Sequence, residues 1–99
     1  MYDKSDKRRL YWLIDQYLLG KIDEPTFCDE FYYSYDLEVD GNALTKVEKA
    51  AFAELSTIAE RFSEYEEDHL GLPNGFYTAE ELKQKIIETK EKLQKQSQQ

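Results

Sequence analysis

The chain has 99 residues, of which 40% are hydrophobic and 34% are charged, and it contains eight Tyr, five Phe and one Trp. This length fits one domain with a single core, and the aromatic content is too high for a disordered chain. The 21 acidic residues outnumber the 13 basic ones, and the net charge of −8 disfavours direct binding to nucleic acid or anionic lipid, because both are polyanions. The charge favours a basic protein as partner.

Cysteine content and hydropathy predict a cytoplasmic protein. Cys28 is the only cysteine, so no internal disulfide is possible and nothing of this kind indicates secretion. No apolar run approaches the ~20 residues of a membrane span. The N-terminal residues lack the apolar stretch of a signal peptide. We therefore expect no membrane contact.

Four helices and no strand are expected, and a glycine separates the first two. One apolar face at helical spacing predicts a helix from residue 5 or 6 to residue 19, and Gly20 can adopt the left-handed conformation that ends it. A second helix is expected over 24–35, with Asp23 as its N-cap and Pro25 in its first turn. The expected inward residues are Leu10, Leu13, Ile14, Tyr17, Leu18, Phe27, Cys28, Phe31 and Tyr35.

Capping signals mark the next two helices. Thr45 with Glu48, and Thr78 with Glu81, fit capping boxes, which predict helices over 46–63 and 79–94. Their expected inner stripes are Val47, Ala51, Leu55, Ile58 and Phe62, and Leu82, Ile86, Thr89 and Leu93. Because each helix has one apolar stripe to bury, we expect an all-α fold, a compact antiparallel four-helix bundle. It forms one domain over 1–99, with 1–4 and 95–99 frayed.

Acidic residues are concentrated in the second helix and the loop after it. Residues 23–44 contain seven acids and no Lys or Arg. At about 100° per residue, four polar residues share the helix face opposite Phe27 and Phe31. They are Asp29, Glu30, Tyr33 and Asp36, and the loop adds Glu38 and Asp40. A cationic partner would relieve the repulsion among these acids, although they could also serve only to keep a small protein soluble.

A second acidic cluster follows the third helix. It consists of Glu64, Glu66, Glu67 and Asp68. The start and the end of the third helix lie at opposite ends of an antiparallel bundle, so the two clusters need not merge. Whether they form one surface stays open at this point.

Residues 36–48 resemble the start of a calcium-binding EF-hand loop. Asp36, Glu38 and Asp40 take loop positions 1, 3 and 5, and a glycine takes position 6. Position 12, where the bidentate carboxylate belongs, is Val47, and Glu48 follows one residue late. A calcium-binding helical protein using a degenerate loop is therefore kept as an alternative.

No catalytic constellation is evident. His69 is the only histidine, which is too few nitrogen ligands for a typical zinc site. Cys28 has no histidine nearby in sequence to activate it, and we expect it to be a buried small apolar residue. No phosphate-cradling glycine-rich loop is present. We expect no enzymatic activity, no metal and no cofactor.

Trp12 is the anomaly of the first helix. It lies opposite Leu10, Ile14 and Tyr17 on the helical wheel. Either another segment covers it, or it is an exposed aromatic anchor for a partner.

Several segments resemble the colicin D-type immunity proteins, including those of contact-dependent growth inhibition systems. Residues 13–22 (Leu-Ile-Asp-Gln-Tyr-Leu-Leu-Gly-Lys-Ile) and 27–31 (Phe-Cys-Asp-Glu-Phe) resemble the opening of that family. Residues 59–63 resemble the end of its third helix, and residues 77–82 resemble the entry to its last. The resemblance implies a helical bundle that neutralises a toxic nuclease, in the colicin D branch a ribonuclease that cleaves transfer RNA.

The resemblance also implies how such a protein acts. Acidic residues of the family are said to cover the basic, RNA-binding cleft of the toxin. The positions of this chain that match in kind are Asp29, Glu30, Asp36, Glu38, Asp40, Glu64, Glu66, Glu67 and Asp68. Tyr33, which shares the face of the helical acids, is expected to add apolar contact. The expected function is that of an immunity protein, and the remaining alternative besides calcium binding is an acidic adaptor, or nucleic-acid mimic, for another basic protein.

Overall fold

A computed structural model describes residues 2–63 and 77–97 of the chain. Four α-helices are present in these ranges: α1 (Arg8–Leu18), α2 (Glu24–Tyr32), α3 (Lys46–Glu60) and α5 (Ala79–Ser97). A π-helix, η1 (Tyr33–Glu38), continues α2 directly, and a short 3-10 helix, η2 (Gly41–Ala43), follows it. The same ranges contain no strand, only one isolated bridge between Phe62 and Tyr77. None of the helices described is both long enough and apolar enough to cross a bilayer.

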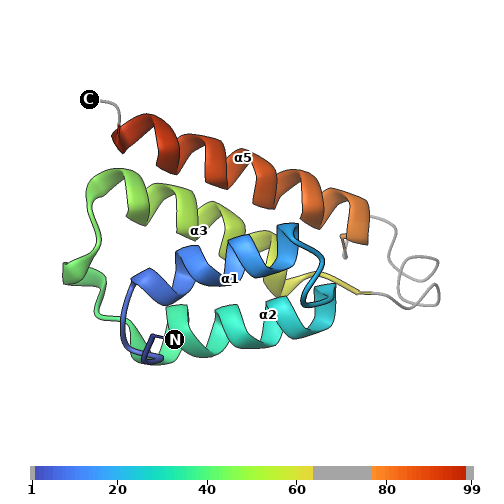
Figure 1. Cartoon of the computed structure of the whole chain (residues 1–99), viewed down its shortest axis with the longest axis horizontal. Coiled ribbons are helices and arrows are strands. Elements are labelled where there is room, and N and C mark those ends of the chain that lie inside the picture. Colours follow the sequence, from blue (N-terminus) through green and yellow to red (C-terminus); the bar gives the residue numbers. More distant parts are fainter. Residues whose placement is uncertain (1, 64–76, 98–99) are drawn as a thin grey trace.

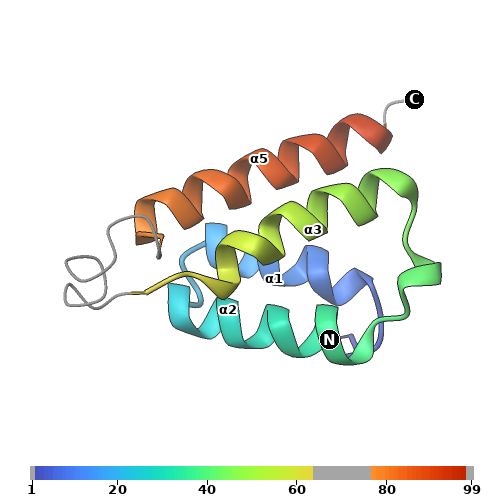
Figure 2. The ribbon, with the colours of Figure 1, turned by 180° about the vertical axis from the view of Figure 1, so that it is seen from behind.

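The four α-helices run alternately in opposite directions (Figure 1). Helices α2 and α5 lie along opposite edges of the molecule, and α1 and α3 lie between them on its two faces, as the view from behind also shows (Figure 2). Helix α1 packs against α2 and α5, and α3 packs against the same two helices. This arrangement is the all-α antiparallel bundle that the sequence predicts.

The predicted helix boundaries with capping residues are confirmed. Gly20 has φ 76°, and the amides of Gly20 and Lys21 donate to Tyr17 and Gln16, which ends α1 in a Schellman motif. The Asp23 carboxylate caps α2 by accepting from the Thr26 amide at 3.0 Å. Both capping boxes form, at the starts of α3 and α5. Local side chain–backbone bonds therefore fix these ends, and such bonds can be read from neighbouring residues.

Four helix ends differ from prediction. α2 ends at Tyr32 rather than at residue 35, because the chain continues as the π-helix η1. α1 begins at Arg8, because the Asp6 carboxylate accepts from the Arg8 amide just before the first turn. α3 ends at Glu60, and the chain then extends into the bridge with Tyr77. α5 runs on to Ser97 instead of fraying after residue 94. The Gln96 side chain bonds both Thr45 and Tyr11, which ties this last turn to the bundle.

The core is built around aromatic rings of α2, η1 and α3. Phe27 stacks on Phe31, Phe31 stacks on Tyr35, and Phe52 of α3 meets the last two rings. The stripes predicted for α1 and α5 are buried, with Leu18 partly so. The stripe predicted for α3 is wrong at Val47, which is exposed, because the inward face turns to Glu48 and Phe52 instead. Hydrophobic periodicity cannot predict a buried glutamate at this position, because it follows only apolar residues.

Candidate functional site

The surface of α2 and η1 carries exposed aromatic and acidic side chains together. We call it the α2–η1 face and define it by Asp29, Tyr32, Tyr33, Asp36, Leu37, Glu38 and Asp40, all exposed. The first four follow the spacing i, i+3, i+4, i+7, which places residues on one side of an uninterrupted α-helix. Here Tyr33 and Asp36 belong to the π-helix that continues α2. Tyr32 and Tyr33 are 48% and 45% exposed, and Leu37 is 58% exposed. Large apolar groups displayed among carboxylates are typical of a protein-binding surface.

Several carboxylates of this face are not neutralised by any other residue that the structure describes. The side chains of Asp29, Asp36 and Glu38 form no ion pair or hydrogen bond within residues 2–63 and 77–96. Asp40 accepts from the Asn42 amide at 2.9 Å, which caps η2 but brings no positive charge. The face is therefore negative as well as partly apolar.

Asp36 lies close enough to α3 for the charge of Glu60, the last residue of that helix, to act on it. Partial burial, and then the negative charge of Glu60, raise the pKa of Asp36 above its ordinary value. Glu60 therefore extends the negative field of the α2–η1 face onto a second helix. Residue 36 follows the second predicted helix and residue 60 lies in the third, so only the packing of the bundle relates them.

Glu30 differs from the other predicted acids, and its assignment as an uncompensated carboxylate is wrong. Its carboxylate accepts from Nη2 of Arg9 on α1 at 2.7 Å. The absence of Lys and Arg from residues 23–44 does not exclude a cation from another helix. Glu30 thus serves the contact between α1 and α2, at the edge of the exposed face.

Tyr33 already contacts a cation within the chain. Nζ of Lys4 lies 4.2 Å from the centre of the Tyr33 ring, in a cation–π arrangement. Both side chains are exposed, so this contact is weak and open to competition. Tyr32, which sequence reasoning did not single out, is as exposed as Tyr33. Its position three residues after Asp29 is the signal that would have included it.

The second acidic cluster, Glu64, Glu66, Glu67 and Asp68, lies outside the described residues, as does His69. The predicted site is therefore placed only in its α2–η1 part.

Residues 36–48 resemble a calcium-binding loop in sequence, but their structure differs from that of an EF-hand. Asp36 and Glu38 belong to a π-helix, where an EF-hand has an open loop. Glu48 is 3% exposed and its carboxylate binds Lys7, Tyr11 and the Thr45 amide. No group of three or more potential metal ligands is found in the part of the chain that the structure describes. The local structure thus gives calcium binding no support.

Cys28 is half-buried against the core. Burial, and then the charges of Asp29 and Glu24, raise the pKa of its thiol to about 12. The thiolate, which is the nucleophilic form, is therefore disfavoured.

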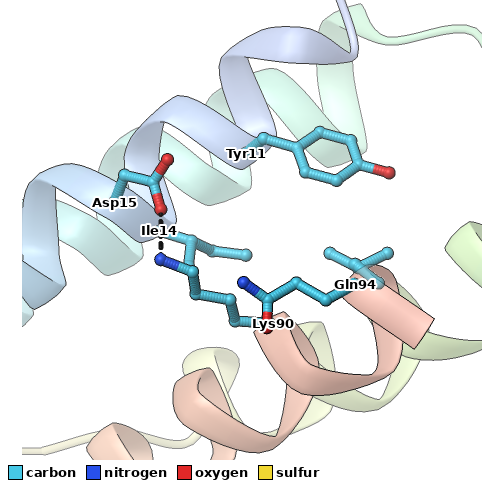
Figure 3. Close-up of a pocket in the computed structure, with 6 residues that line it drawn as sticks. Tyr11, Ile14, Asp15, Lys90 and Gln94 are labelled. Carbon is cyan, nitrogen blue, oxygen red and sulfur yellow. Dashed lines mark hydrogen bonds and ion pairs between the residues drawn. The ribbon is translucent and has the colours of Figure 1, made fainter. Parts of the chain in front are cut away.

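A groove of about 220 Å³ lies between α1 and α5 (Figure 3), and no residue of the α2–η1 face lines it. Ile14 and Leu93 form its apolar part, and Tyr11 lines one end. The Asp15 carboxylate and the Lys90 amine meet across it at 2.9 Å. This pair joins partly exposed side chains, so it adds little stability.

Comparison with known proteins gives no relative: no family model, no curated protein and no solved structure matches the chain.

Proposed function

We propose that this chain is a stoichiometric protein inhibitor, an immunity protein that binds a toxic nuclease domain through the α2–η1 face. The partner surface is a basic cleft that normally holds RNA, and the carboxylates of the face take the place of the phosphates. Inhibition needs no cofactor and takes place in the cytoplasm. The choice of a transfer-RNA-cleaving ribonuclease rests on the resemblance to colicin D-type immunity proteins.

The observation that carries this proposal is the composition of one exposed surface. Asp29, Asp36 and Glu38 have no positive partner within the described residues, and they surround two exposed tyrosines and Leu37. A basic cleft supplies the missing charges, and its field speeds the encounter. Tyrosines add contact area at low entropic cost and form cation–π pairs with arginine.

The alternative of an acidic adaptor for a different basic protein uses the same surface. Growth distinguishes the two, because only a cognate immunity protein restores growth to cells that express the toxin. If a nuclease domain is encoded beside the gene of this chain, that domain is the toxin to test. Rescue by the wild-type chain supports the proposal, and failure to rescue or bind refutes it.

The site is tested with a charge reversal and a matched control. The variant Asp29→Lys with Asp36→Lys reverses two exposed acids of the face that have no ion-pair partner among the described side chains. The control, Glu80→Lys with Glu91→Lys, reverses two exposed acids of α5 and gives the same net charge. We expect the first variant to weaken binding to the nuclease domain by about 30-fold or more, the effect of losing charge pairs buried on binding.

Helicity and rescue complete this experiment. Circular dichroism should give the same helical signal for both double variants and the wild type, because none of the four acids has a partner in the described structure. Growth rescue should fail only for the α2–η1 variant. Unchanged affinity in that variant, or an equal loss in the α5 control, would refute the assignment of the face.

A further inference from the structure

Arg9 is a buried cation that joins α1 to the π-helix. The residue is 7% exposed. Its Nε donates to the Ser34 hydroxyl at 3.0 Å, and its Nη2 donates to the Glu30 carboxylate at 2.7 Å. The guanidinium carbon also lies 5.4 Å from the centre of the Trp12 ring. One side chain thus holds both the end of α2 and the first turn of η1.

The residue that Arg9 holds is the one around which the π-turn closes. Ser34 is fully buried, and its carbonyl accepts from the Val39 amide at 2.7 Å, a bond that spans five residues. An α-helix closes its bonds over four residues, so this turn contains one extra residue. The two neighbours of Ser34 have different environments: Tyr33 is exposed, and Tyr35 stacks on Phe31.

The extra residue determines where the second half of the α2–η1 face points. Asp29 lies before the π-turn, whereas Asp36, Leu37 and Glu38 lie within it. Relaxation of the turn to an α-helix would shift the following side chains by one residue, which is about 100° around the axis. The direction in which Asp36, Leu37 and Glu38 point relative to Asp29 would then change, and with it the surface that a partner meets.

We propose that Arg9 is a positioning residue for the α2–η1 face: its bond to Ser34 fixes the π-turn and so sets the direction of Asp36, Leu37 and Glu38 relative to Asp29. Partner binding then depends on a side chain that is shielded from the partner. Arginine suits this role because its planar guanidinium reaches a hydroxyl and a carboxylate at the same time and stacks on an aromatic ring. The consequence for partner binding rests on the proposed function, whereas the effect on the turn does not.

The experiment compares two neighbouring substitutions that conserve charge. Lysine in Arg9→Lys can pair with Glu30 but does not reproduce the guanidinium fork to Ser34. Arg8→Lys is the control, because Arg8 is exposed and contacts Asp6 and the Tyr2 ring, neither of which belongs to α2 or η1. Amide hydrogen exchange is followed at Val39, which reports the π-turn, and at Leu55 in the core of α3, which reports opening of the whole bundle.

We expect Arg9→Lys to speed exchange at Val39 by at least about tenfold while Leu55 is unchanged, as for a local opening. The same variant should weaken binding to the nuclease domain at least about tenfold, with no change in net charge to account for it. Arg8→Lys should change neither exchange nor affinity. Ser34→Ala removes the hydroxyl that accepts from Arg9 and keeps the arginine. It should likewise speed exchange at Val39, and it replaces Arg9→Lys in the test if that variant does not fold.

Each other outcome counts against the inference. Unchanged protection of Val39, or equal acceleration at Val39 and Leu55, means that Arg9 does not fix the turn. Faster exchange with unchanged affinity means that the turn does not position the face. If the wild-type chain does not bind the nuclease domain, the proposed function is wrong, and exchange at Val39 alone still decides whether Arg9 fixes the π-turn.

Discussion

The carboxylate of Glu48 on α3 accepts a hydrogen bond from the hydroxyl of Tyr11 on α1. The same carboxylate binds Nζ of Lys7 at 3.0 Å and the Thr45 amide at 2.8 Å. The Gln96 amide of α5 donates to the Tyr11 hydroxyl at 3.1 Å and accepts from Thr45 at 2.8 Å. One buried acid therefore connects three helices at one end of the bundle.

Removal of this acid should destabilise the fold strongly. We expect Glu48→Ala to lower the free energy of unfolding by about 2–4 kcal/mol, because it breaks a partly buried ion pair, a capping box and the bond to Tyr11. Urea denaturation measures the loss. Glu54→Ala is the control, since Glu54 pairs with Lys85 and Lys92 in solvent and should matter much less. Equal losses for the two variants would contradict a special role for Glu48.

The same acid should make the protein sensitive to low pH. Burial opposes the charge of Glu48, but the hydrogen bonds from Tyr11, Thr45 and Lys7 outweigh it, so the pKa lies below the ordinary 4.5. A lowered pKa contributes stability above the unfolded value and loses it as the pH falls through the folded value. As the pH is lowered below 4.5, the urea concentration at the midpoint of unfolding should therefore decrease in the wild type, and it should decrease less in Glu48→Ala. Identical pH profiles for the two proteins would contradict this assignment.

The ionised carboxylate of Asp36 should have the opposite effect on stability to that of Glu48. Its pKa is raised by partial burial and by Glu60, so its charge opposes folding above that pKa and the penalty disappears as the acid takes up a proton. Asp36→Asn should slightly raise the melting temperature at neutral pH, and the gain should vanish in acid. Asp29→Asn is the control on the same face, without the neighbouring Glu60. A melting temperature lowered by Asp36→Asn at neutral pH would contradict the expected sign.

Two exposed leucines test the apolar part of the α2–η1 face. Leu37 lies on this face and Leu19 lies after α1, and they are 58% and 67% exposed. Leu37→Ala should weaken binding to the nuclease domain by about 1–2 kcal/mol, as expected for an apolar contact near the centre of an interface. Leu19→Ala should leave the dissociation constant unchanged. Calorimetric titration of both variants measures the difference, and equal affinities would exclude Leu37 from the interface.

The thiol of Cys28 should react slowly while the protein is folded. Its pKa of about 12 leaves very little thiolate near neutral pH. At about pH 8, alkylation by iodoacetamide should be on the order of 100-fold slower than in urea-unfolded protein. Mass spectrometry follows the modification over time. Equal rates before and after unfolding would show that the burial is lost in solution.

Local signals were sufficient to predict most of the fold. Gly20, Asp23 and the two capping threonines act through bonds to residues close by in sequence, and each marks a helix end as predicted. The apolar stripes of α1 and α5 follow the helical period without interruption. The acidic, exposed character of Asp29 and Asp36 could likewise be read from their position opposite Phe27 and Phe31.

The remaining features depend on contacts that are distant in sequence. The partner of Glu30 is 21 residues away, and the Arg9 bond to Ser34 at the π-turn spans 25. The last turn of α5 is fixed by residues 51 and 85 positions earlier. Glu48 resembled an ordinary capping residue, and its burial became evident only once Lys7 and Tyr11 lay beside it. Periodicity describes one helix at a time, so it does not predict such pairs.

Trp12 is the only tryptophan of the chain, and it lies beneath the guanidinium that also binds Ser34. Its indole packs partly against the core rather than projecting as a free anchor. Selective excitation of tryptophan therefore observes the junction between α1 and η1 without any label. The protein contains its own optical reporter, and a change in its emission on adding a partner would register movement at that junction in real time.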